Sequence, residues 1–181
     1  MKKLIAEDLF RVSGREYTFT SLLYWCLKAP GLHFLVWVRV YQGSNLRIIK
    51  LLSHFIISIL KIVYGFQFSP KLKIGRGFYI GHWGHIVINV DTKFGNNCNI
   101  GPGIIIGKNH GKDSGAPQFG DEVWIGSNSV IVGPVVIDSN VVIAPGAYVN
   151  FNVPSNSLVL GNPGKIIPKD DPTKFMINRK V

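Results

Sequence analysis

The sequence predicts a mainly β fold, a parallel β-helix built from six-residue repeats, with an α-helical part before it. Large apolar residues recur every six positions through the later part of the chain. Glycine gathers in the same part: three glycines precede residue 65 and seventeen lie from Gly65 to Gly164. The first 66 residues instead show the apolar spacing of helices. We therefore expect an N-terminal helical segment at 1–66, a β-helix domain at 67–168 and a C-terminal tail at 169–181.

The helical segment is expected to hold aromatic-rich helices at 19–27 and 32–41, separated by Ala29-Pro30-Gly31. A further helix is expected at 46–64, where apolar residues follow the spacing of one helix face: Ile48, Ile49, Leu52, Phe55, Ile56, Ile59, Leu60 and Val63. Its other face carries Arg47, Lys50 and Lys61, and these charges exclude a membrane-spanning helix. Two interpretations stay open. The apolar stripe packs on its own domain or on a neighbouring subunit, or the basic helix rests on an anionic membrane.

The repeat domain follows from the six-residue step. The step lands on apolar residues at Phe119, Ile125, Ile131, Ile137, Ile143 and Val149. It also runs through Phe68, Ile74, Ile80 and Ile86, slips by two positions, and resumes at Ile88, Phe94, Ile100 and Ile106. Six residues form one short strand and a turn, which cannot bury an apolar face alone. Three such units close a triangular coil, and stacked coils then enclose a column of aliphatic side chains.

The period breaks at two places, where functional residues are expected. One is the slip between Ile86 and Ile88. The other is the polar, glycine-rich stretch 107–118, which carries Lys108, His110 and Lys112 and must loop out of the coil. This loop is either a tolerated surface excursion or one wall of a substrate site.

Composition and charge exclude several classes of protein. Apolar residues make up 46% of the chain, which excludes a disordered chain, and the net charge is +10. The positive charge is spread along the sequence without a nucleic-acid-binding motif, so no nucleic-acid partner is expected. Two cysteines, Cys26 and Cys98, form no disulfide framework or zinc pattern and suit a reducing cytoplasm. Glu7 and Asp8 interrupt the N-terminal apolar stretch that a signal peptide would need.

The candidate chemistry centres on two histidines at the register slip, His82 and His85, which flank Trp83. Neither histidine occupies an interior position of the repeat. A third metal ligand at suitable spacing is lacking, and no nucleophile or dinucleotide motif occurs. A histidine acting as general base on a hydroxyl is the simplest chemistry available, because its ordinary pKa lies near neutral pH.

Residues 67–168 resemble the serine acetyltransferase branch of the hexapeptide-repeat acyltransferases. The resemblance is carried by Phe68-Ser69-Pro70, Lys73-Ile74-Gly75-Arg76-Gly77, Ile80-Gly81-His82, Ile86-Val87-Ile88 and Gly161-Asn162-Pro163-Gly164-Lys165. The helical Trp37-Val38-Arg39-Val40-Tyr41 also resembles that branch, while Gly81-His82-Trp83-Gly84 is closer to capsule and exopolysaccharide O-acetyltransferases of the colanic acid type. The resemblance implies a left-handed β-helix, a homotrimer with active sites between subunits, and acetyl-CoA as donor, without a metal.

The same resemblance implies roles for individual residues. His82 matches the catalytic base, and Gln67 stands where the family has the carboxylate that orients it. Gly107, Ser127, Pro145 and Lys165 match positions along the acetyl-CoA groove. Trp83, His85 and His110 are the residues we expect to bind the acceptor substrate.

Two differences from the serine enzymes bear on the acceptor. The Asp before their catalytic histidine is Gly81 here, and their Arg-His pair is Gly115-Ala116. Since a free amino acid needs charged partners, the sequence favours acetyl transfer to a hydroxyl of a sugar or a lipid-linked polysaccharide precursor. L-serine O-acetyltransferase is the alternative enzyme, and a non-catalytic scaffold that binds an anionic surface or a partner is the alternative of another class. The expected location is the cytoplasm, and contact with the inner face of the cytoplasmic membrane stays open.

Overall fold

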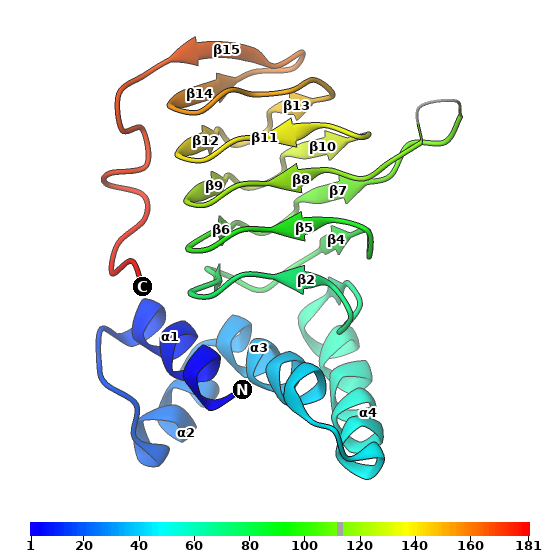
Figure 1. The fold of residues 1–181 in the computed structure, drawn as a ribbon, viewed down its shortest axis with the longest axis vertical. Coiled ribbons are helices and arrows are strands. Elements are labelled where there is room, and N and C mark those ends of the chain that lie inside the picture. Colours follow the sequence, from blue (N-terminus) through cyan, green and yellow to red (C-terminus); the bar gives the residue numbers. More distant parts are fainter. Residues whose placement is uncertain (112–113) are drawn as a thin grey trace.

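The computed structural model describes residues 1–111 and 114–181, and Figure 1 shows a column of β-coils standing on a group of helices. The helices are α1 (Lys2–Ser13), α2 (Phe19–Lys28), α3 (Pro30–Gly43) and α4 (Arg47–Tyr64). The break between α2 and α3 is narrower than expected. It consists of Ala29 alone, because Pro30 occupies the first turn of α3, where its missing N–H is tolerated. No separate pattern in the sequence predicted α1.

The strands form three parallel sheets, one for each side of the coil. The first sheet contains β1 (Phe66–Gln67), β4 (Ile86–Ile88), β7 (Ile105–Gly107), β10 (Val130–Val132) and β13 (Tyr148–Val149). The second contains β2 (Lys73–Ile74), β5 (Lys93–Phe94), β8 (Gln118–Phe119) and β11 (Val136–Ile137). The third contains β3 (Tyr79–Ile80), β6 (Asn99–Ile100), β9 (Val123–Ile125), β12 (Val141–Ile143), β14 (Ser157–Leu160) and β15 (Lys165–Pro168). Only β15 pairs antiparallel, with β14, among the strands described.

The core confirms the six-residue column. Every residue on the predicted interior positions is buried except Ile74, which is half-buried. The slip is also confirmed by the register. Ile80 pairs with Ile100 and Ile88 pairs with Ile106, so the first coil holds two more residues at this corner than the coil above it. The extra residues lie in the turn at 81–85, which contains both candidate histidines.

A buried ion pair joins the helices to the β-helix. Arg39 of α3 donates from Nε to Asp8 Oδ2 of α1 at 2.8 Å, and both side chains are buried. The same guanidinium donates to the carbonyl oxygens of Ile74 and Gly75, while Asp8 Oδ1 accepts from the N–H of Phe78 at 3.0 Å. One pair of side chains therefore fixes two helices against the first coil.

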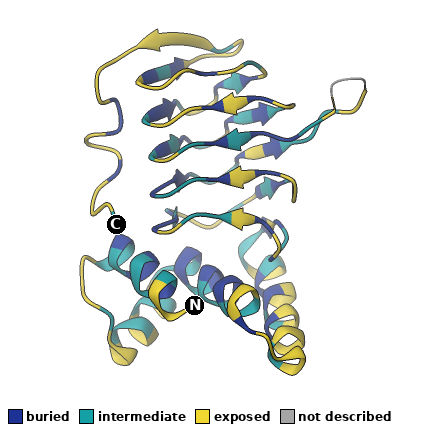
Figure 2. Cartoon of the chain, viewed as in Figure 1, coloured by how far each residue is buried: buried dark blue, intermediate teal, exposed yellow. Residues whose placement is uncertain are grey.

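Helix α4 differs from the expectation that its apolar stripe packs against its own domain. Its buried residues are Ser53, Ile57 and Leu60. The stripe from Ile48 through Phe55 to Val63 is largely exposed, and Figure 2 shows exposed residues along this helix and α2. The chain alone leaves this face uncovered. Among the described residues, no helix combines the length and apolar character needed to cross a membrane.

The C-terminal tail returns along one side of the coils toward α1 (Figure 1). Thr173 donates to Asn140, and the Val181 N–H donates to Asn97 Oδ1 at 2.9 Å. Arg179 then reaches the carbonyl oxygen of Val12 at 2.9 Å. The tail therefore ties the later coils to the helical segment.

Candidate active site

The extended turn at 81–85 stands where the first coil meets the helices. The Gly81 N–H donates to the Ile100 carbonyl at 3.2 Å, and the Gly84 N–H donates to the Tyr64 carbonyl at 3.0 Å. Tyr64 ends α4, and its hydroxyl lies 3.0 Å from His33 Nδ1 of α3. The turn is thus held by the coil above it on one side and by α4 on the other, while His82, Trp83 and His85 remain exposed.

Close contact between α3 and β3 brings the end of α2 beside this turn. A Cβ on Gly31 would lie 2.4 Å from the Ile80 carbonyl oxygen, so only glycine permits the approach. The residues just before Gly31 therefore lie next to those just after Ile80. Together with Trp25, Tyr79 and Trp83, Lys28 and His82 line a pocket of about 340 Å³. Sequence reasoning missed Lys28, because no local pattern marks a contact that depends on helix packing.

A second pocket lies on the other side of His82. It has a volume of about 240 Å³, and its walls include Tyr79, Gly101, Trp124 and Ser127. His82 and Tyr79 line both pockets. The histidine therefore borders two concave spaces, and a general base must lie within hydrogen-bond reach of the group that it deprotonates.

His85 and Gln67 lie apart from His82 within one chain. His85 lines a different pocket of about 480 Å³, formed with Trp83 and the end of α4, so the two histidines face different spaces. Gln67 is exposed on β1 and lines none of the pockets that contain His82. The Asp91 carboxylate pairs with Lys108 at 3.0 Å. No carboxylate is found beside His82 in the described part of this chain.

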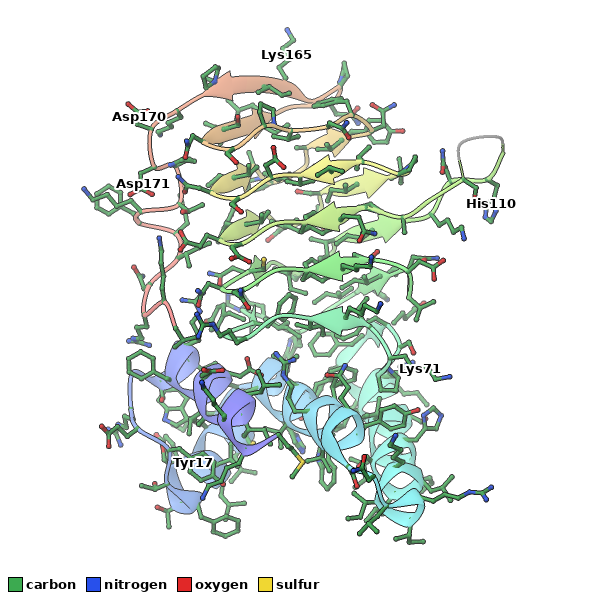
Figure 3. All side chains as sticks on the ribbon, viewed as in Figure 1. Tyr17, Lys71, His110, Lys165, Asp170 and Asp171 are labelled. Atoms are coloured by element: carbon green, nitrogen blue, oxygen red, sulfur yellow. The ribbon has the colours of Figure 1, made fainter. Side chains whose placement is uncertain are left out.

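The donor-side positions also lie apart. Ser127 shares a pocket with His82, whereas Gly107, Pro145 and Lys165 do not. Figure 3 shows Lys165 at the end of the β-helix farthest from the helices. It also shows His110 on the loop that projects from the coil. In this loop the Gly115 N–H donates to Asn109 Oδ1, and Lys112 lies outside the described residues.

No metal site accompanies these residues. Within 1–111 and 114–181, no group of three or more His, Cys, Asp or Glu side chains is placed to hold a metal ion. The two cysteines are free, and burial raises the pKa of the Cys98 thiol to about 12. That thiol is not a nucleophile at neutral pH.

Comparison with known proteins identifies the family. Residues 116–150 match the family described as bacterial transferase hexapeptide (six repeats). The chain is 33% identical to the serine acetyltransferase of Staphylococcus xylosus over 93% of this chain and 78% of the relative. It is 32% identical to that of Synechococcus elongatus, over 92% and 69%. The crystal structure of Neisseria gonorrhoeae serine acetyltransferase matches with a TM-score of 0.76 and 28% identity, over 93% of this chain and 67% of that chain.

The fold and the pocketed histidine thus define a hexapeptide-repeat acyltransferase. The chain belongs to this family, in which its named relatives are serine acetyltransferases. It is therefore an enzyme that transfers an acyl group, and acetyl-CoA is the donor of the acetyltransferases in this family.

Proposed function

We propose that the chain is an L-serine O-acetyltransferase that uses acetyl-CoA as donor and His82 as general base. Two observations support the proposal. Serine acetyltransferases match almost the whole chain, and one of them was crystallised in complex with serine, at 30% identity and a TM-score of 0.74. His82 lines two pockets, and these supply the geometry. The pocket that contains Ser127 would take the thioester, and the pocket that contains Lys28 would take the acceptor.

The proposed chemistry needs only one proton carrier. His82 removes the proton of the acceptor hydroxyl while that oxygen forms a bond to the thioester carbonyl carbon. The tetrahedral intermediate carries its negative charge on the former carbonyl oxygen, which a backbone N–H at the edge of the coil stabilises. The carbon–sulfur bond then breaks, and the imidazolium returns its proton to the leaving CoA thiolate. The acetyl ester and CoA are the products, with no covalent enzyme intermediate.

Lys28 is our candidate partner for the carboxylate of serine. The charged residues of the serine enzymes correspond to Gln67, Gly81, Gly115 and Ala116 here, so another cation is needed. Lys28 is the charged side chain other than His82 among the residues that line the acceptor pocket. An ammonium group there would hold the carboxylate by a charge-assisted hydrogen bond.

A sugar hydroxyl is the second candidate acceptor, and a specific observation favours it. Neither pocket of His82 is lined by an Asp or Glu that could pair with the ammonium group of serine. The acceptor pocket instead presents Trp25, Tyr79 and Trp83, whose rings offer apolar faces to a sugar. Under this candidate the acceptor is a free or lipid-linked saccharide, and the chemistry at His82 is unchanged.

One assay separates the candidates. Release of free CoA from acetyl-CoA is followed with a thiol-reactive dye, with L-serine, with a neutral saccharide, or with no acceptor. We expect L-serine to accelerate release above the hydrolysis rate. Lys28→Met should raise the KM for serine about 10–100-fold, the value of a charged hydrogen bond, with little change in the KM for acetyl-CoA. Acceleration by the saccharide alone would select the second candidate. If acetyl-CoA fails to bind, the chain is a non-catalytic scaffold.

We also propose that the enzyme is a homotrimer. Residues 119–164 contain no Lys or Arg and only three acidic residues, Asp121, Glu122 and Asp138. This part of the β-helix carries little charge and so suits burial against another subunit, where unpaired charges would be costly. The mass measured by light scattering should be three times that of the 20.1 kDa chain. A monomer at micromolar concentration would contradict the proposal.

A further inference from the structure

Two helices leave apolar faces uncovered at the same end of the molecule. On α2, Phe19, Leu23 and Leu27 follow one another at the four-residue spacing of a single stripe, and all three are exposed. No residue of α2 is buried. On α4 the exposed stripe consists of Ile48, Leu52, Phe55, Ile59 and Ile62. We call these two stripes together the apolar helical face.

The helices lie on either side of α3, at the end of the molecule opposite β15 (Figures 1 and 2). Exposure within this face is high, since Leu27 is 87% exposed and Ile62 is 86% exposed. Scattered exposed apolar side chains are ordinary, but contiguous ones mark a surface that contacts something else. The face therefore requires a partner that accepts apolar side chains.

The charge around the face specifies that partner. No Asp or Glu occurs from residue 17 to residue 90, a stretch that contains eight Lys and Arg. On α4, Arg47 and Lys50 are exposed beside the stripe, and Lys61 is half-buried. Face-to-face contact between two copies would bring mainly positive charges together, with exposed Glu16 before α2 as a nearby acidic side chain. Anionic lipid headgroups pair with these charges, while the apolar side chains enter the acyl region below them.

We propose that the apolar helical face lies on the surface of an anionic lipid bilayer. Lys and Arg side chains of α4 then extend along the helix to the headgroups, as long basic side chains do at membrane interfaces. Binding draws on two sources: burial of the Phe and Leu side chains, and attraction of the basic residues.

The proposal has a consequence for the candidate active site. The end of α4 contributes Ile62 and Val63 to the pocket that also contains Trp83 and His85. The extended turn at 81–85 therefore adjoins the apolar helical face. On a bilayer this turn lies close to the headgroups, where an acceptor that carries a lipid would present its polar part. The membrane contact itself does not depend on which acceptor is used.

Vesicle sedimentation with the full chain tests the proposal. The wild-type protein should sediment with vesicles of phosphatidylglycerol mixed with phosphatidylcholine at low salt. Most of it should be released at high salt, because surface charge attraction is screened. Vesicles of phosphatidylcholine alone should retain much less. Equal binding to both compositions, or no binding to either, would overturn the proposal without bearing on acetyl transfer, which is measured separately.

Two phenylalanines form a matched pair of variants. Phe55→Ser lies within the face, whereas Phe175→Ser lies on the tail, where the side chain is 83% exposed. We expect Phe55→Ser to weaken vesicle binding about tenfold and Phe175→Ser to leave it unchanged. Leu27→Ser should also weaken vesicle binding, because the proposal places the α2 stripe on the same bilayer. Each side chain is exposed, so circular dichroism should show the fold intact. If Phe55→Ser instead lowers the oligomeric mass in solution and vesicle binding is unaffected, the face binds another copy and the proposal is wrong.

Discussion

The β-helix and the helical segment use the same kinds of apolar side chain in opposite ways. In the β-helix, Ile125, Ile131 and Ile137 are fully buried by the coils above and below them. In the helical segment, α2 has no buried residue, and α4 buries only Ser53, Ile57 and Leu60. A repeat that stacks on itself covers its own apolar residues. The helices are covered in part by the first coil, and the chain leaves their outer faces exposed.

The largest expected effect is on turnover, at the turn 81–85 where the β-helix meets the helical segment. His82→Ala should reduce kcat about 10²–10⁴-fold, the usual contribution of a general base, with little change in acetyl-CoA affinity. His85→Ala should affect KM for the acceptor at most, because His85 lines a different pocket. Steady-state kinetics on both variants provide the measurement. Loss of turnover in His85→Ala with activity retained in His82→Ala would mean that the base is misassigned.

The next largest effect concerns the joint that holds the helices to the first coil. Arg39→Met removes the partner of the buried Asp8 carboxylate and the donor to two carbonyl groups. Loss of one partner of a buried ion pair costs about 3–5 kcal/mol, so urea unfolding should show a destabilisation of this size. Asp8→Asn in the Arg39→Met background should recover part of the loss, since the unpaired charge is gone. A cost below about 1 kcal/mol would show that the two regions are not coupled through this pair.

A pair of isoleucines compares the two regions directly. Ile131→Ala removes a fully buried side chain from the column and should cost about 2–5 kcal/mol. Ile59→Ala removes a side chain of the same size from the exposed face of α4 and should change stability by about 0.5 kcal/mol or less. Both are measured by urea unfolding of the purified chain without lipid. Similar losses at the two positions would mean that the face of α4 is covered in solution.

The fold was predictable wherever one spacing of apolar residues repeats along the chain. The apolar residues from Phe119 to Val149 follow one six-residue spacing. The same structural pattern therefore occurs several times within about thirty residues. The extended turn at 81–85 was visible as a slip in that spacing, which also located His82. By contrast, the Arg39–Asp8 pair joins residues 31 positions apart and has no periodic signal.

The surroundings of the candidate site were less predictable for a related reason. The presence of Lys28 in the His82 pocket depends on the contact between Gly31 and Ile80, which only the packing of α3 against β3 reveals. On α4, periodicity indicated an amphipathic helix but not which side meets the protein. The side of α4 that packs against the rest of the chain carries Ser53 and Ile57. Apolar residues occur on more than one face of this helix, so the spacing alone did not identify the packed side. A hydrophobic pattern identifies residues that avoid water without identifying what covers each one.

The smallest predicted effect concerns His33, which contacts the end of α4 beside the extended turn. Burial lowers the pKa of His33 below its ordinary value, and its Nδ1 lies 3.0 Å from the Tyr64 hydroxyl. With the folded pKa depressed, the unfolded chain takes up the proton first as the pH falls. The contribution of His33 to stability is therefore fully present above the unfolded pKa of about 6.5 and is lost as the pH falls through the folded value.

Unfolding free energies at pH 7.5 and at about pH 5.5, a range chosen to span the ordinary histidine pKa, test this expectation. The wild-type chain should be less stable at the lower pH, and His33→Gln should show a smaller loss over the same range. The other histidines are present in both proteins, so the difference between the two slopes isolates His33. Because Tyr64 accepts the N–H of Gly84 through its carbonyl oxygen, protonation of His33 should also loosen the anchor of the turn that carries His82. If the unfolding free energies of the two proteins depend on pH in the same way, protonation of His33 does not weaken the contact between α3 and α4. The helical segment would then hold the turn by apolar packing alone.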